Sequence, residues 1–148
     1  MDNTPSTLPK VTSRNLRVFL AVKDSDQRSH MEDNLVMDGF DVRTFSSAAT
    51  LWDAFQQRPA RMIITERRFG GGLSGLDLSR SIRKHYLLPY IYIVVLSTMS
   101  RLQEIKEGLA AGVDDYLVKP PNPLQVRSRV LVGLRWLQYI DSLHEEKS

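Results

Sequence analysis

The chain contains no cysteine, so disulfide bonds and thiol chemistry are excluded. Its three histidines, His30, His85 and His144, fall on three different predicted helices and lack the spacing of a metal site. The apolar runs are far shorter than the length that spans a bilayer, and residues 1–15 lack the hydrophobic stretch of a signal peptide. We therefore expect a soluble protein of the cytoplasm that does not contact a membrane.

The chain also lacks a concentrated charge of either sign. Its net charge of +3 is small for 148 residues. Positive residues gather only at Arg67-Arg68 and in the group Arg127, Arg129 and Arg135. A modest excess of this kind is typical of a solvated surface, so we do not expect direct binding to nucleic acid. The hydrophobic content of 42% is enough for the core of one ordinary domain.

Short apolar segments alternate with helix-like segments along most of the chain. Strands are predicted over 16–22, 40–45, 62–65, 91–96 and 115–118, and helices over 26–38, 48–57, 74–86, 100–112 and from 123 onward. Five β–α units in regular alternation predict an α/β fold: a three-layer, doubly wound (βα)5 parallel sheet. We expect a disordered lead-in over 1–15, the domain core over 16–122, and an extended C-terminal helix of the same domain over 123–148.

Local signals place the helices within this pattern. Met31 and Leu35 mark the inner face of the first helix, and Ser74 with Asp77 forms a capping box at the start of the third. A second capping box is predicted at the start of the fourth helix from Ser100 and Gln103. The residues that we expect this fourth helix to turn inward are Leu102, Ile105 and Leu109.

Four strands end in charged or hydroxylic residues. Asp24, Glu66, Ser97 and Lys119 each follow or close an apolar run. Because the carboxyl ends of strands in an open α/β sheet meet at one crevice, we expect these four residues to be neighbours.

Three motifs carry a resemblance to a known family. Residues 110–120 read AAGVDDYLVKP, residues 95–98 read VLST, and residues 73–78 read LSGLDL. On these motifs, the chain from about 16 to 143 resembles the receiver domain of bacterial two-component response regulators. The resemblance implies a flavodoxin-like strand order of 2-1-3-4-5. It also implies a phosphorelay in which a pair of acids and an Asp hold Mg²⁺, and the Asp accepts a phosphoryl group from a sensor kinase.

The sequence departs from that pattern at its centre. Lys23 and Asp24 stand where the pair of acids is expected, and Glu66 stands where the phosphoryl-accepting Asp is expected. We expect the ammonium of Lys23 to lie beside Asp24 and Glu66 and to take the place of the metal ion. No cofactor is therefore expected; any Mg²⁺ that did bind would have Asp24 and Glu66 as its ligands. Glu66 can reach toward Lys119 and imitate part of the phosphorylated state.

The resemblance assigns roles to the remaining crevice residues. Ser97 and Tyr116 match the pair that switches conformation in such domains, and Lys119 matches the residue that contacts the phosphoryl oxygens. The Lys119–Pro120 bond is expected to be cis, which a proline permits.

Three functional interpretations follow. The first is an atypical, non-enzymatic receiver that signals through protein contacts without phosphorylation, the altered site being either a permanent imitation or an inert salt-bridge network. The second is a conventional receiver that uses Mg²⁺ to accept a phosphoryl group. The third is a flavodoxin-like domain that binds a small molecule behind the glycine-rich loop 70–72. We expect the first.

The final helix points to partners. Val132, Trp136, Tyr139 and Leu143 recur at spacings of four, three and four, as in a short heptad seam. The helix resembles the extended helix that links receivers to output domains, including enzymes of cyclic-dinucleotide signalling. We expect protein partners or such an output domain, and in addition a homodimer formed through the fourth helix, the fifth strand and the fifth helix.

Overall fold

The computed structural model describes residues 10–98 and 101–147. Within these residues, five parallel strands form one sheet in the order β2-β1-β3-β4-β5, and five helices connect them. The predicted fold class is confirmed. The strands are β1 Arg17–Ala21, β2 Asp41–Phe45, β3 Met62–Glu66, β4 Tyr92–Ser97 and β5 Asp115–Val118; the helices are α1 Ser25–Met37, α2 Ala48–Gln57, α3 Gly75–His85, α4 Leu102–Ala110 and α5 Pro123–Lys147.

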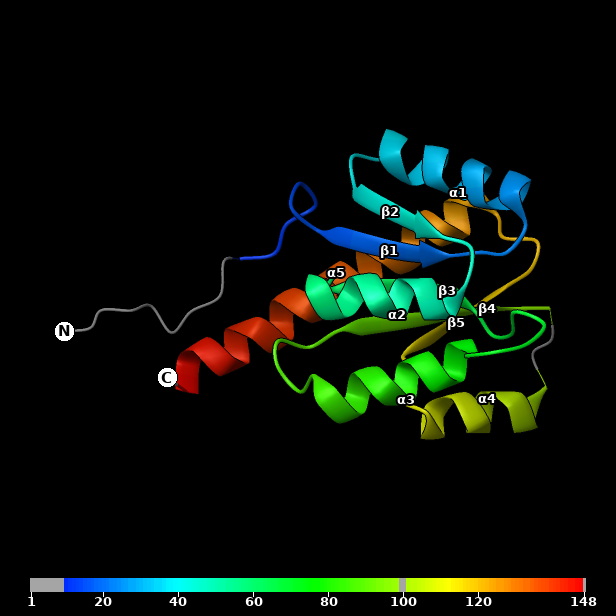
Figure 1. Cartoon of the computed structure of the whole chain (residues 1–148). Helices are drawn as coiled ribbons and strands as arrows, with labels where there is room; N and C mark the ends of the chain where they lie inside the picture. The colour runs from blue at the N-terminus through cyan, green and yellow to red at the C-terminus, as the bar shows by residue number, and fades with distance from the viewer. Residues whose placement is uncertain (1–9, 99–100, 148) are drawn as a thin grey trace.

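The helices cover both faces of the sheet, as Figure 1 shows. Residues of α1 and α5 pack on one face and residues of α2 and α3 on the other, so the core has two separate layers. β3 and β4 are buried along their whole length. Burial on both faces explains why these strands read as continuous apolar runs rather than as alternating patterns.

The capping box predicted for α3 is present. The Ser74 side chain accepts a hydrogen bond from the Asp77 amide at 3.0 Å, and the Ser74 amide donates to the Asp77 carboxylate at 3.1 Å. Met31 and Leu35 are buried on the inner face of α1, as predicted. After α1, Gly39 has φ +93°, a left-handed conformation that glycine adopts without a steric penalty.

The predicted inner face of α4 is wrong for its two leucines, whereas Ile105 is half-buried. Leu102 and Leu109 face solvent and are 68% and 62% exposed, whereas the buried position is Gly108. The helix begins after Arg101, which makes no capping hydrogen bond through its side chain; the proposed cap Ser100 lies outside the described residues. The rotation of α4 is fixed by polar contacts from Arg67 and Tyr116, and not by burial of its leucines.

Part of the predicted lead-in is ordered. Val11 is 5% exposed and belongs to the core layer of α1 and α5, and its carbonyl accepts a hydrogen bond from the Gln138 side chain at 2.9 Å. The expectation of disorder is therefore wrong for residues 10–15, because one apolar side chain and one helix contact hold this segment. Residues 1–9 of the predicted lead-in lie outside the described residues.

Helix α5 carries two apolar faces along its 25 residues. One face packs into the core through Val126, Val130, Leu134 and Leu137. The other leaves Val132, Trp136, Tyr139 and Leu143 between 39% and 54% exposed. Neither α5 nor any other helix in the described part of the chain combines the length and apolar character needed to cross a membrane.

Candidate functional site

The carboxylate of Glu66 lies at the carboxyl edge of the sheet, and both of its oxygens are engaged. The Lys23 backbone amide donates to Glu66 Oε2 at 2.6 Å, and Lys119 Nζ donates to Glu66 Oε1. Glu66 is 5% exposed. One cation and one main-chain dipole thus compensate a buried negative charge that would otherwise be costly.

The end of β3 is held by two backbone contacts of Arg67, the residue that follows Glu66. The Arg67 amide donates to the Leu96 carbonyl at 3.1 Å, and the Gly75 amide donates to the Arg67 carbonyl at 2.9 Å. A side chain at Gly75 would collide with the Glu66 carbonyl oxygen. Only glycine therefore lets α3 begin so close to the strand, which fixes the position of Glu66.

The structure corrects the role predicted for Lys23. Of the ion pairs between described residues, none joins the Lys23 ammonium to Glu66 or Asp24. Lys23 is exposed, and its Nζ lies beside Gly70 in the loop after β3. Lys23 contacts Glu66 through its main chain instead, because the end of β1 directs its amide, and not its side chain, toward the carboxylate.

Asp24 is committed to a structural contact. Its exposed carboxylate caps α1 by accepting a hydrogen bond from the Gln27 amide at 2.8 Å. In the part of the chain that the structure describes, no group of three or more His, Cys, Asp or Glu side chains could hold a metal ion. Mg²⁺ needs several free oxygen ligands. In this structure one Asp24 oxygen caps α1 and both Glu66 oxygens accept hydrogen bonds, so the two carboxylates expected to hold Mg²⁺ already serve other contacts.

Ser97 and Lys119 complete the site on the side of β4 and β5. Ser97 ends β4 and is 7% exposed, and the Lys119 amide donates to the Ser97 carbonyl at 2.9 Å. The Lys119–Pro120 bond is cis, as the resemblance implied. The structure thus brings Glu66, Ser97 and Lys119 to one edge, while Asp24 remains at its rim.

Tyr116 lies against α4. Its hydroxyl donates to the Glu104 carbonyl at 3.0 Å, and a Cβ at Gly108 would overlap that hydroxyl. Burial raises the pKa of the Tyr116 hydroxyl above its ordinary value, so it stays protonated and able to donate. The ring is therefore held by its hydrogen bond to α4, and Gly108 leaves the space that it occupies.

The sequence pattern described as the response regulator receiver domain matches residues 18–131. The chain belongs to the response regulator receiver family. The transcriptional regulatory protein GltR of Pseudomonas aeruginosa is 33% identical over 128 residues, which are 86% of this chain and 52% of GltR. The phosphate regulon regulatory protein PhoB of Rhizobium meliloti is 31% identical over 102 residues, which are 69% of this chain and 44% of PhoB. This receiver therefore spans about half the length of the curated relatives that it matches.

Solved structures support the fold. The chemotaxis protein CheY4 of Vibrio cholerae superposes with a TM-score of 0.75 at 20% identity, over 80% of this receiver and 98% of CheY4. A probable two-component response regulator/GGDEF domain protein superposes with a TM-score of 0.77 at 21% identity, over 85% of this receiver and 52% of that chain.

Arg67 is the site residue that sequence reasoning missed. It follows Glu66 directly and is 6% exposed. Its guanidinium donates to the Glu104 carbonyl at 3.2 Å and pairs with the Glu107 carboxylate. The sequence alone indicates only that Arg67 forms a local positive pair with Arg68. The available signal was a charged residue directly after Glu66 at the end of a buried strand, since a buried arginine requires a partner.

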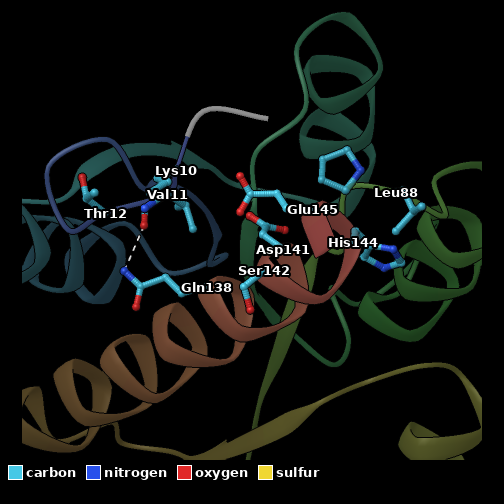
Figure 2. Close-up of a pocket in the computed structure, with 10 residues that line it drawn as sticks. Lys10, Val11, Thr12, Leu88, Gln138, Asp141, Ser142, His144 and Glu145 are labelled. Atoms are coloured by element: carbon cyan, nitrogen blue, oxygen red, sulfur yellow. Dashed lines mark hydrogen bonds between the residues drawn. The ribbon is translucent and has the colours of Figure 1, made fainter. Parts of the chain in front are cut away.

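A separate cavity of about 560 Å³ lies at the opposite edge of this receiver, beyond the amino ends of the strands. Figure 2 shows it between the segment at Val11, the loop at Leu88 and the end of α5. Gly70–72 does not line this cavity, nor the second hollow of about 590 Å³ along α5. Neither hollow supports the interpretation of the glycine loop as a gate.

Proposed function

We propose that this receiver is a non-enzymatic signalling module of the cytoplasm whose output does not depend on phosphorylation. The observation that supports it is the state of Glu66, which occupies the position of the phosphoryl acceptor and has both oxygens engaged, by Lys23 and Lys119. Hydrogen bonds and a paired cation on both oxygens make this carboxylate a weaker nucleophile toward a phosphoryl donor than a free one. The proposed module needs neither Mg²⁺ nor another cofactor.

The charge at the crevice supports the same proposal. Glu66 carries one negative charge at neutral pH, whereas a phosphoryl group carries nearly two and has three acceptor oxygens. Its ion pair with Lys119 nevertheless occupies the residue that would contact those oxygens. Glu66 is one methylene longer than Asp and reaches Lys119 unaided. The crevice is thus a partial and permanent imitation of a phosphorylated site.

The proposed output is protein contact through α4, β5 and α5, without direct contact to nucleic acid. This face carries apolar side chains that are exposed in the described structure: Leu102, Leu109, Val118, Val132, Trp136 and Tyr139. Two occupants fit the comparisons and the face: a second copy of the chain, and an output domain following α5. Relatives about twice as long include transcriptional regulators and a GGDEF protein, so an output domain for this chain, including one of cyclic-dinucleotide signalling, is part of the proposal.

Binding of a phosphoryl mimic tests the proposal. The wild-type chain is incubated with Mg²⁺ and beryllofluoride and followed by fluorine NMR, and in parallel with acetyl phosphate and followed by intact mass. We expect no bound fluoride and no phosphoryl mass gain. Saturable beryllofluoride binding, or a phosphoryl group mapped to Glu66, would overturn the proposal in favour of a conventional receiver.

A matched variant checks that the assay can detect binding on this fold. The double substitution Lys23→Asp and Glu66→Asp rebuilds the acidic site of the family. We expect it to bind beryllofluoride in the presence of Mg²⁺, whereas Lys23→Asp alone leaves Glu66 in place and does not bind. A wild-type signal as large as that of the double variant contradicts the role given to the two departures.

A further inference from the structure

Helix α4 has an unusual attachment to the rest of the domain. Its two leucines at 102 and 109 face solvent, and its buried position is Gly108, which has no side chain to pack. Apolar burial, the usual source of helix docking, therefore contributes little at this helix. Something else must hold α4 in register.

Arg67, a buried arginine, makes two of the side-chain contacts that attach α4, and the Tyr116 hydroxyl makes another. Arg67 extends from the end of β3, next to Glu66, and reaches α4 at two points one turn apart: the Glu104 carbonyl and the Glu107 carboxylate. The Arg67 side chain is 7% exposed, and that of Glu107 is 45% exposed. A buried guanidinium on a carboxylate forms a strong, charge-assisted contact whose geometry is specific.

Tyr116 shares the same anchor point. The Glu104 carbonyl accepts hydrogen bonds from both the Arg67 guanidinium and the Tyr116 hydroxyl. The missing side chain at Gly108 makes room for the ring. Arg67 therefore contacts α4 at the same backbone carbonyl that Tyr116 contacts. It connects both to the end of β3, directly after Glu66.

We propose that Arg67 is a positioning residue that locks α4 and Tyr116 in one arrangement and so holds the contact face of this receiver ready without a phosphoryl group. We call the contacts of Arg67 with Glu104 and Glu107 the latch. This inference rests on the proposed function, because a fixed latch is useful only where the site around Glu66 does not switch. It adds to that function a specific residue: Arg67, and not the chemical state of Glu66, sets the position of α4.

Hydrogen exchange measured by mass spectrometry tests the latch. Arg67→Leu removes both contacts to α4, and the control Arg68→Leu makes the same change at the next, exposed residue. We expect amides of 102–110 to exchange about tenfold faster in Arg67→Leu, since losing charged hydrogen bonds changes an opening equilibrium by that factor. Exchange in α1 and α2 stays as in the wild type, and Arg68→Leu shows no change.

Equal exchange of α4 in Arg67→Leu, Arg68→Leu and the wild type would overturn the proposal. If Arg67→Leu does not fold, Glu107→Gln decides, because it weakens one contact at a half-exposed position. Faster exchange confined to α4 in Glu107→Gln then supports the latch, and unchanged exchange overturns it. A second readout is the Tyr116 ring, whose NMR signals should broaden or shift in Arg67→Leu and stay unchanged in Arg68→Leu.

The same measurement separates this inference from the proposed function. Wild-type exchange is compared with and without Mg²⁺ and beryllofluoride. A change in α4 on adding the mimic would contradict phosphorylation-independent output, whatever the variants show. Suppose that α4 exchange in the wild type does not change with the mimic, and that Arg67→Leu exchanges like the wild type. The proposed function would then stand, and the latch would be rejected.

Discussion

Arg83 of α3 and Asp114 of the segment before β5 form an ion pair of 2.8 Å that joins three elements. The guanidinium also donates to the carbonyls of Gly112 and Ile91, and the carboxylate accepts from the Ile93 amide at 2.8 Å. Burial raises the pKa of the Asp114 carboxyl although these donors oppose the shift. The pair thus fastens α3 to β4 and to the segment before β5.

Replacing Arg83 with leucine should destabilise the domain by about 2–4 kcal/mol, because Asp114 would stay buried without its cation. The side chains are 23% and 15% exposed, which places the pair between surface and core. The control Arg80→Leu breaks the exposed pair with Asp77 and should cost at most about 1 kcal/mol. Urea denaturation of both variants checks the difference, and equal midpoints would contradict it.

Replacing Gly108 with alanine should destabilise the chain by about 1–3 kcal/mol, against the trend of helix propensity. Alanine is normally favoured over glycine inside a helix by about 1 kcal/mol. Here the added Cβ would overlap the Tyr116 hydroxyl, so the ring or the helix must move. The free energy of unfolding in urea measures the effect.

A double variant isolates the cause of that loss. In a Tyr116→Ala background the ring is absent, so Gly108→Ala should become neutral or stabilising. If the alanine costs as much without the ring as with it, the contact with Tyr116 is not the reason for the glycine.

Replacing Lys119 with methionine should cost about 2–4 kcal/mol, since it leaves the buried Glu66 carboxylate without its cation. Adding Glu66→Gln should recover part of the loss, because a neutral amide needs no counter-charge. Lys84→Met, at an exposed position of α3, is the control and should change stability little. Denaturation curves of the four proteins decide, and a double variant less stable than Lys119→Met would contradict the assignment.

The capping box of α3 gives a pH-dependent prediction. Hydrogen bonds from Ser74 hold the pKa of the Asp77 carboxyl below its ordinary value of 3.8. A folded-state pKa below the unfolded one means that the stabilisation is present above the unfolded value and is lost as the pH falls through the folded one. Asp77→Ala should therefore cost about 1 kcal/mol at pH 7 and less near pH 3. A gap between wild type and variant that stays constant with pH would exclude this origin.

The exposed stripe of α5 should mediate self-association. The rings of Trp136 and Tyr139 lie 5.8 Å apart between centroids, tilted by 30°, and both residues line a groove of about 590 Å³. Trp136→Glu should convert a dimer into a monomer in sedimentation velocity, because a charge in an apolar interface is costly. Leu87→Glu, at a 78% exposed position of the loop before β4, should leave association unchanged. A monomeric wild type would reject this contact.

The fold and the centre of the site could be predicted because they depend on rules that act locally or through topology. Apolar runs bounded by helix signals predicted the five strands to within one residue at each end. The convergence of strand ends placed Glu66 near Lys119, although they lie 53 residues apart in the chain. The capping box of Ser74 and Asp77 needed only a four-residue pattern.

The misses have a common physical origin in contacts that no sequence period encodes. The sequence shows that Lys23 is charged but not that its amide, rather than its ammonium, faces Glu66. Leu102 and Leu109 follow a plausible helical spacing, yet the rotation of α4 is set by Arg67, 37 residues before Glu104 in the chain. Such pairings depend on three-dimensional fit between elements and become visible only when the elements are assembled.

The engaged carboxylate of Glu66 has a consequence for timing. A phosphoryl bond decays, and its hydrolysis sets how long an ordinary signal persists; an amino-acid side chain held by Lys23 and Lys119 has no bond of that kind to lose. On the proposed function, no hydrolysis reaction at Glu66 sets the duration of the signal. What a cell could then vary is the number of copies of the chain and of its partners, so expression and degradation would govern how strong the message is and how long it lasts.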